Sequence, residues 1–276
     1  MNEVQRAKAS TLRALHDGPA LVLPNAWDAG SAVLIAQAGA KAIATTSGGI
    51  SWALGYSDGQ NLTRADMVES VRRIADAVQV PVTADVEGGY GPAPEDIAAT
   101  VEAIIGAGAV GVNLEDSRAP GGPLFEVAEQ AERLRAGRTA AERAGLPGLV
   151  INARTDVFLF QIGEPGGRFD DVVARAAAYA EAGADCLFVP GLVDLAELER
   201  LVRAVSLPVN VMAGPGAPNV ADFEAKGVRR VSVGSGITQA AYTVAQRAAT
   251  ELLTKGSYGE LDGALGFGDI DPLFRH

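Results

Sequence analysis

Two carboxylates end a short β-branched run in the segment PVTADVEGGYG, residues 81–91. Asp85 and Glu87 stand two positions apart, so a strand would place both on one face. A third acid, Glu115, ends the run VNLE, and Arg154 ends the run INAR. Carboxylates that are brought together repel one another unless a cation lies among them, and oxygen ligands suit Mg2+ or Mn2+. The pattern predicts a hard-metal site with an arginine beside it.

The glycines that follow Glu87 would leave these acids open to a small molecule. Residues 88–91 read GGYG, and glycines cannot shield the end of a strand. We expect this stretch to let a substrate approach the metal.

Other catalytic groups are scarce in this chain. The two histidines, His16 and His276, lie outside the strand-like runs, so neither is placed to act as a general base. Cys186 lies inside an apolar run and is expected to be a core residue, since buried thiols are usually inert. None of the four lysines stands at the carboxyl end of a strand-like run, which argues against Schiff-base chemistry: Lys8, Lys41, Lys226 and Lys255.

Composition and charge narrow the classes of protein. The chain has 276 residues, 48% of them hydrophobic, and a net charge of −11 with acids spread along its length. Nucleic-acid binding would need a basic stripe, which is missing. A single cysteine excludes an internal disulfide. The first residues form no apolar leader, and no run approaches the roughly 20 apolar residues of a membrane helix. We expect a cytoplasmic protein with no nucleic-acid or membrane partner.

Eight short apolar runs alternate with segments of helical periodicity, which is typical of buried parallel strands joined by helices. The runs cover residues 20–23, 41–45, 80–86, 109–114, 148–153, 184–189, 207–212 and 230–233. Eight such units favour one closed (β/α)8 TIM-type barrel over an open sheet. We expect residues 1–276 to form a single barrel domain, with an extra helix over 2–16 and a tail over 258–276.

In such a barrel, functional groups collect at the carboxyl ends of the strands. After the second run, Ser47, Gly48 and Gly49 could offer backbone N–H groups and a hydroxyl to a carboxylate. Arg154 could hold a carboxylate or a 2-oxo oxygen through its planar fork, and Asn210 lies in the seventh run. A metal, a guanidinium and backbone amides together stabilise a developing oxyanion. A 2-oxo acid that passes through an enolate would use all of them.

Five motifs along the second to fifth runs resemble the isocitrate lyase/phosphoenolpyruvate mutase superfamily. They are TTSGG, GYSDGQNLT, TADVEGGYG, VNLEDS and ARTD, in the order in which the family has them. The resemblance implies a Mg2+-dependent barrel that acts on 2-oxo acids through enolate-like intermediates. It also implies an oligomer whose subunits exchange a helix.

The resemblance assigns a role to each matching position. Asp85 would contact Mg2+ directly, whereas Glu87 and Glu115 would hold it largely through water. Asp58 would lie near the metal, and Arg154 would bind the substrate. Ser47, Gly48 and Gly49 would cradle the substrate carboxylate, and Asn210 is a further candidate for substrate binding. Among these, Arg154, Asp58 and Glu115 are the expected catalytic residues.

The loop after the fourth run departs from the family. Residues 117–125 read SRAPGGPLF and lack the Lys-Lys-Cys-Gly-His of the lyases and the Lys and Asn-Ser of the phosphonate-forming mutases. Glu87 also replaces a second aspartate. Carbon–carbon cleavage or decarboxylation of a small 2-oxo or 2-hydroxy (di)carboxylate needs mainly a metal-stabilised enolate, so it loses least from these changes. The alternatives are a phosphonopyruvate-type carbon–phosphorus enzyme, a non-catalytic 2-oxo-acid binder and, last, a phosphosugar barrel that uses AGPGAP and GSG.

Two further segments carry expectations about motion and assembly. Gly121 and Gly122, flanked by prolines, could make the loop over 117–125 a gate. The segment 236–256 is apolar around much of its circumference, so it needs cover on more than one side. We therefore expect a homodimer or homotetramer that exchanges this helix.

Overall fold

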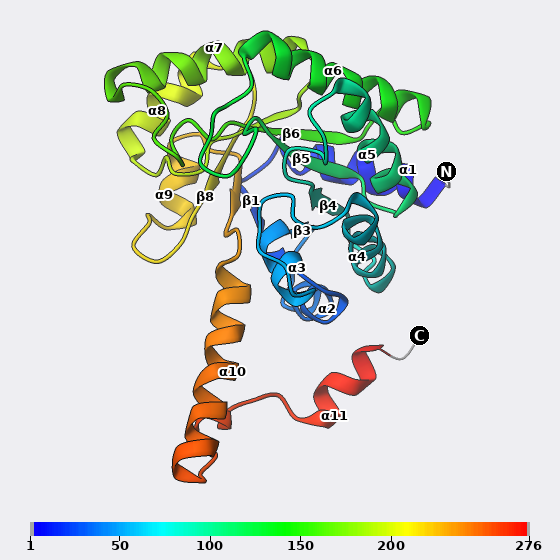
Figure 1. Cartoon of the computed structure of the whole chain (residues 1–276), viewed down its shortest axis with the longest axis vertical. Helices are drawn as coiled ribbons and strands as arrows, with labels where there is room; N and C mark the ends of the chain where they lie inside the picture. Colours follow the sequence, from blue (N-terminus) through cyan, green and yellow to red (C-terminus); the bar gives the residue numbers. More distant parts are fainter. Residues whose placement is uncertain (1–2, 275–276) are drawn as a thin grey trace.

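The strands of this protein form a barrel in the computed structural model, which describes residues 3–274 (Figure 1). All neighbouring strands are parallel, in the order β1-β9-β8-β7-β6-β5-β4-β3-β2. The strands are β1 (Leu21–Leu23), β2 (Asn25–Ala26), β3 (Ile43–Thr45), β4 (Val82–Asp85), β5 (Gly111–Glu115), β6 (Val150–Arg154), β7 (Cys186–Phe188), β8 (Val209–Met212) and β9 (Arg230–Ser232).

The barrel closes through a first strand that is split in two. β1 pairs with β9 and β2 pairs with β3, and only Pro24 separates the two halves. Proline has no N–H to donate to a ladder, which explains the break. Counted as one, β1 and β2 bring the strands to the eight that the sequence predicts, and the TIM-type fold is confirmed.

Helices follow the strands and form the outer layer (Figure 1). The predicted extra helix before the first strand is present as α1. The α-helices are α1 (Glu3–Ala14), α2 (Ala29–Gln37), α3 (Ser47–Ala53), α4 (Arg64–Ala77), α5 (Pro94–Gly106), α6 (Val127–Arg143), α7 (Arg168–Glu181), α8 (Leu195–Ala204), α9 (Val220–Ala225), α10 (Gly236–Lys255) and α11 (Phe267–Ile270). Short 3-10 turns cover Pro165–Gly167, Gly259–Leu261 and Asp271–Phe274.

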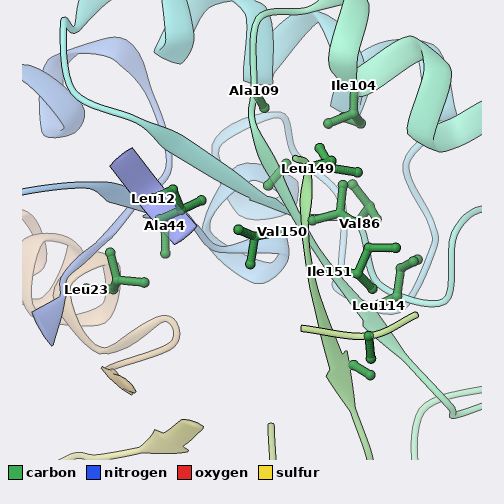
Figure 2. Packing of buried hydrophobic residues seen from close by; sticks show 14 of the residues in the cluster. Leu12, Leu23, Ala44, Val86, Ile104, Ala109, Leu114, Leu149, Val150 and Ile151 are labelled. Atoms are coloured by element: carbon green, nitrogen blue, oxygen red, sulfur yellow. The ribbon is translucent and has the colours of Figure 1, made fainter. Parts of the chain in front are cut away.

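The apolar core lies mainly between the strands and the helices. Leu114 of β5, for example, faces Gly137 of α6, while its neighbour Asn113 points into the barrel. Figure 2 shows Leu12 of α1 among the core residues, and a side chain at Gly111 would collide with it. Helix α1 therefore packs against the amino-terminal end of the barrel. This leaves the carboxyl ends of the strands as the place for chemistry.

Helix α10 does not return to the barrel but projects from it, and at its far end the chain turns back into the tail that carries α11 (Figure 1). Of its 20 residues only Thr238 is buried, and Leu253 is 85% exposed. Val22, which points outward from β1, is 43% exposed where a barrel strand would normally be covered by a helix. No helix within residues 3–274 is long and apolar enough to cross a membrane. His276 lies outside the described residues.

Candidate active site

A cavity of about 50 Å3 opens inside the barrel and reaches the carboxyl ends of the strands. Asp85 and Arg154, the last residues of β4 and β6, both line it. Asn210 of β8 lines it as well. The remaining wall is largely polar: Asn25, Thr45, Thr83, Asn113, Asn152, Arg230 and Ser232 contribute to it.

Asp85 is held in one orientation by its neighbours. Its Oδ1 accepts a hydrogen bond from Asn113 Nδ2 at 2.9 Å, and its Oδ2 accepts one from Ser47 N at 3.1 Å. Its own N–H donates to Thr45 Oγ1 at 2.8 Å. Each carboxylate oxygen keeps further lone pairs, so the residue is oriented without being saturated.

Glu87 reaches the site from a turn, because β4 ends at Asp85. Its backbone is left-handed, with φ at 52°, a conformation that costs free energy for a residue other than glycine. Its carboxylate accepts hydrogen bonds from Gln60 N and, at 3.3 Å, from Tyr90 Oη. The prediction that Asp85 and Glu87 are alternate positions of one strand is therefore wrong, because the turn rather than the pleat directs Glu87.

Burial and like charge disturb the acids of this region. Burial, together with the charges of Asp58 and Asp85, raises the pKa of Glu87 to about 7. Burial and Asp85 also raise the pKa of Asp58. Strongly perturbed carboxyl groups in one cavity are common at functional sites.

The glycines after Glu87 serve packing rather than access. A Cβ at Gly89 would lie 2.1 Å from Ile97 Cδ1, and one at Gly91 would lie 2.2 Å from the carboxyl group of Asp96. Both glycines have positive φ. The expectation that this stretch leaves open room for substrate is therefore wrong, because neighbouring side chains occupy the space.

The SGG motif begins helix α3 instead of forming a bare loop. Ser47 N donates to Asp85, and Gly49 N faces Thr46 Oγ1 at 3.5 Å. A Cβ at Gly49 would collide with Thr238 and Trp27 at 2.6 and 2.8 Å. The motif therefore packs α3 against its surroundings and ties it to Asp85. Its predicted contact with a substrate carboxylate remains a prediction.

Asp58 lies against Gly48 in helix α3. A Cβ at Gly48 would lie 3.2 Å from Asp58 Oδ2 and 3.3 Å from Ser235 Oγ. The absence of a side chain at Gly48 therefore lets Asp58 approach the site. Its raised pKa reflects the charge of Asp85, which places the two acids in one electrostatic field.

Arg154 is clamped between two acids. Its Nη1 lies 3.0 Å from Glu115 Oε2, and its Nε donates to Asp156 Oδ1 at 2.6 Å. Ser117 Oγ in turn donates to Asp156 Oδ2 at 2.6 Å. Burial raises the pKa of Glu115. The charge of Arg154 lowers this pKa by less, because the same guanidinium also binds Asp156.

A buried ion pair between Asp116 and Arg175 holds the backbone of Asp156 in place. Asp116 Oδ1 accepts the backbone N–H of Asp156 at 3.0 Å, and its Oδ2 accepts hydrogen bonds from Tyr179 and Arg175 at 2.8 and 3.0 Å. Charged hydrogen bonds of this kind fix the rotamers around them. The acid that directs Arg154 is thus itself anchored to helix α7.

Asn210 lies among the amides in the interior of the barrel. Its Oδ1 accepts from Asn152 at 2.9 Å, and its Nδ2 donates to Val211 O at 2.8 Å. Asn152 also donates to Asn113, which holds Asp85. A hydrogen-bonded chain of amides therefore connects β8 to the acid of β4, while substrate binding by Asn210 stays a prediction.

The loop over 117–125 touches the loop that contains Gly59. Ser117 and Leu124 form an isolated antiparallel bridge, and Phe125 N donates to Asp116 O at 2.8 Å. A Cβ at Gly59 would lie 2.4 Å from Pro120 Cγ, so the two loops touch. Its predicted role as a gate remains a prediction.

The donor set fits a hard cation that is bound mainly through water. Within residues 3–274, no group of three or more His, Cys, Asp or Glu side chains converges closely enough to hold an ion directly. The acids Asp58, Asp85 and Glu87 nevertheless repel one another, Asp85 lines the cavity, and Mg2+ usually keeps several waters beside one or two carboxylates. Direct metal binding by Asp85, with the other acids acting through water, remains a prediction.

Sequence reasoning did not assign Gln60, Tyr90, Asn113 and Asp156 as site residues. Asn113 and Asp156 stand beside Glu115 and Arg154 in the motifs VNLEDS and ARTD, so proximity was a usable signal. Gln60 meets Glu87 only because two loops come together, whereas Tyr90 reaches Glu87 within one turn, three residues further along the chain.

The sequence is similar to those of known proteins over most of its length. A family model described as phosphoenolpyruvate phosphomutase matches residues 12–253. An uncharacterised protein of Mycobacterium tuberculosis is 37% identical over 220 residues, 80% of each chain. The 2-methylisocitrate lyase of Escherichia coli is 32% identical over 66% of this chain and 61% of that enzyme. An oxaloacetate decarboxylase of Rhodopseudomonas palustris is 32% identical over 65% of this chain and 60% of that enzyme.

Solved structures share the fold. A Burkholderia cenocepacia protein, whose assignment as a lyase or mutase is provisional, superimposes with a TM-score of 0.92 at 37% identity, over 100% of this chain and 98% of the other. Oxaloacetate acetylhydrolase bound to the inhibitor 3,3-difluorooxalacetate gives a TM-score of 0.86 at 25% identity, over 97% and 93% of the two chains. With the family model covering most of its residues, the chain belongs to the isocitrate lyase/phosphoenolpyruvate mutase superfamily.

Proposed function

We propose that this protein is a Mg2+-dependent enzyme that acts on a small 2-oxo or 2-hydroxy (di)carboxylate through an enolate-like intermediate, as a carbon–carbon lyase or decarboxylase. The observation that carries the proposal is the clamped Arg154 beside Asp85 at the mouth of one cavity. The relatives named 2-methylisocitrate lyase and oxaloacetate decarboxylase support carbon–carbon cleavage.

When bound, the metal would supply Lewis acidity to a 2-oxo oxygen, with Asp85 as its direct ligand and Glu87 and Glu115 as acceptors for its waters. Arg154 donates toward the oxygen on which negative charge develops. Because Glu115 and Asp156 already fix the guanidinium, little reorganisation is needed when that charge appears. Asp58, whose pKa is raised by burial and by the charge of Asp85, is a further catalytic candidate in this proposal.

Carbon–phosphorus chemistry is the second candidate, favoured by the phosphoenolpyruvate phosphomutase description of the matching family model. The loop over 117–125 contains one arginine and no lysine to balance a phosphonate. A dianionic phosphonate needs more positive charge than a carboxylate does. This makes the carbon–carbon reaction the better fit.

The test is a substrate panel. Oxaloacetate, 2-methylisocitrate, 2,3-dimethylmalate and phosphonopyruvate would each be assayed for the formation of pyruvate, oxalate, phosphate or phosphoenolpyruvate, with Mg2+ and with excess chelator. We expect turnover of at least one carboxylate substrate and its loss with chelator. Turnover of phosphonopyruvate alone would favour the second candidate, and binding without any turnover would identify a 2-oxo-acid binder.

We also propose that the chain assembles as a homodimer or homotetramer through α10. A groove of about 690 Å3 lies beside β1, with Leu15, Val22 and Ile35 among its lining residues. Most apolar residues of α10 are exposed in their own subunit, whereas Ile237 at its start lines the groove. A second copy's α10 has the chemistry to fill this groove, because both surfaces are apolar and uncovered.

A further inference from the structure

The interior of the cavity carries a guanidinium without a partner. Arg230, the first residue of β9, is 2% exposed and lines the cavity together with Asp85 and Arg154. Its Nε and Nη1 have no hydrogen-bond partner, and its side chain forms no ion pair within residues 3–274. A buried charge normally has an opposite charge and satisfied hydrogen bonds, so this arrangement is incomplete.

Other buried arginines of the chain are paired. Arg154 meets two carboxylates, and Arg175 binds Asp116. Arg133 donates to the carbonyl groups of Gly88 and Gly91. Arg133 also leaves its Nε without a partner, so within residues 3–274 Arg230 differs from these arginines because its guanidinium forms neither an ion pair nor a hydrogen bond.

The surroundings of Arg230 fit the end of a small polar ligand. Thr83 Oγ1 and Asn152 Oδ1 also lack hydrogen-bond partners and belong to residues that line the same cavity. The volume of about 50 Å3 is enough for one carboxylate group or a few waters. Within this wall, Arg230 supplies a positive charge with free donors.

The charge of Arg230 is felt elsewhere in the barrel. Burial lowers the pKa of His16 to about 4, and repulsion from Arg230 is the next cause. The charge of Asp85 also acts on Arg230, although the two side chains form no ion pair or hydrogen bond within residues 3–274. Arg154, by contrast, already uses its Nε and Nη1 on Asp156 and Glu115, so Arg230 offers the less committed fork.

We propose that Arg230 binds the second anionic group of the substrate, so that the enzyme prefers a diacid to a monoacid of equal length. This inference rests on the proposed function, because the first carboxylate and the 2-oxo group must bind near Asp85 and Arg154. Arg230 would then determine specificity from inside the barrel, away from the bond that breaks.

The test compares two four-carbon ligands, the diacid 3,3-difluorooxaloacetate and the monoacid 2-oxobutyrate, by calorimetry with Mg2+ present. Arg230→Met should weaken the diacid by about 10- to 100-fold, the range for hydrogen bonds to a charged group, and leave the monoacid unchanged. Arg229→Met, which removes the same charge from the partly exposed neighbouring position, should match the wild type. An equal loss for both ligands, or no loss for either, would overturn the assignment.

Further arms separate the possible failures. If the wild type binds neither ligand, the proposed function fails and this inference with it. If both bind and Arg230→Met keeps the preference for the diacid, only the role of Arg230 is wrong. Should Arg230→Met fail to fold by circular dichroism, Arg230→Lys, which keeps the charge without the fork, should show a reduced preference, and an unchanged one would count against the inference.

Discussion

Arg154 donates to Asp156 at 2.6 Å although only one residue separates them at the end of the same strand. Asp156 is completely buried and also accepts from Ser117. The direction of the guanidinium is therefore fixed from within its own strand end, and Glu115 adds a second constraint from β5.

Arg154→Lys should reduce turnover of a 2-oxo acid by about 100- to 1000-fold, the usual cost of one oxyanion contact. Lysine keeps the charge but cannot donate to Glu115 and Asp156 while facing the substrate. Steady-state kinetics and a thermal melt measure the two effects. A variant that turned over at the wild-type rate would contradict the mechanism, and Arg135→Lys, exposed on α6, is the control.

Asp85→Ala should abolish Mg2+ binding, because no neighbouring group can replace a direct oxygen ligand. Glu115→Ala should weaken binding less if Glu115 acts through water. Isothermal calorimetry of the metal provides the measurement, with Glu102→Ala on the exposed face of α5 as the control. Unchanged affinity in Asp85→Ala would refute the assignment of the metal ligand.

We expect the free energy of unfolding to fall in mild acid because His16 is buried in its neutral form. Its pKa is lowered from 6.5 to about 4 by burial and by Arg230, so the unfolded chain binds a proton that the folded chain rejects. The stabilisation is fully present above pH 6.5 and is lost as the pH falls toward 4, by up to about 3 kcal/mol. Urea unfolding at pH 7.5 and 5 should show a smaller difference for His16→Phe than for the wild type. Equal differences would show that His16 carries no linkage.

Arg133→Met should loosen the turn that carries Glu87. Arg133 is 1% exposed, and its donors hold the carbonyl groups of Gly88 and Gly91. Hydrogen exchange should become at least several-fold faster over residues 88–91, with weaker Mg2+ binding as a consequence. Arg135→Met on the exposed face of the same helix is the matched control. Unaltered exchange in Arg133→Met would mean that the turn is held by other contacts.

Light scattering at micromolar concentration should give the mass of a dimer or a tetramer. Leu253→Glu places a charge on the apolar surface of α10, where the leucine is 85% exposed in its own subunit. We expect this variant to have a lower mass and a lower melting temperature. A wild-type mass of one chain would exclude the assembly.

The sequence predicts the barrel well because its signals are local and repeated. Each buried strand is a continuous apolar run, and the helices between them have a clear period. The split at Pro24 is also a local effect, yet it was not predicted, since proline near a strand start is commonly tolerated.

The site was harder to predict where two loops meet. Asp85 and Arg154 follow from their positions as last residues of strands. Glu87 was assigned to a strand because alternation is the default for a β-branched run, whereas a left-handed residue at φ 52° redirects it. The glycine-rich stretches looked open because a sequence does not show which side chains will fill the space above a glycine.

The acids around Glu87 lower the stability of the metal-free protein, although we propose that the reaction needs them. Because its pKa is raised from 4.5 to about 7, the folded chain loses stability as the pH rises through this range when no metal is bound. Glu87→Gln should therefore raise the free energy of unfolding of the metal-free protein at pH 8, by up to about 3 kcal/mol. Saturating Mg2+ should narrow that gap. A screen for heat resistance alone would consequently select against the acids that we propose for the reaction.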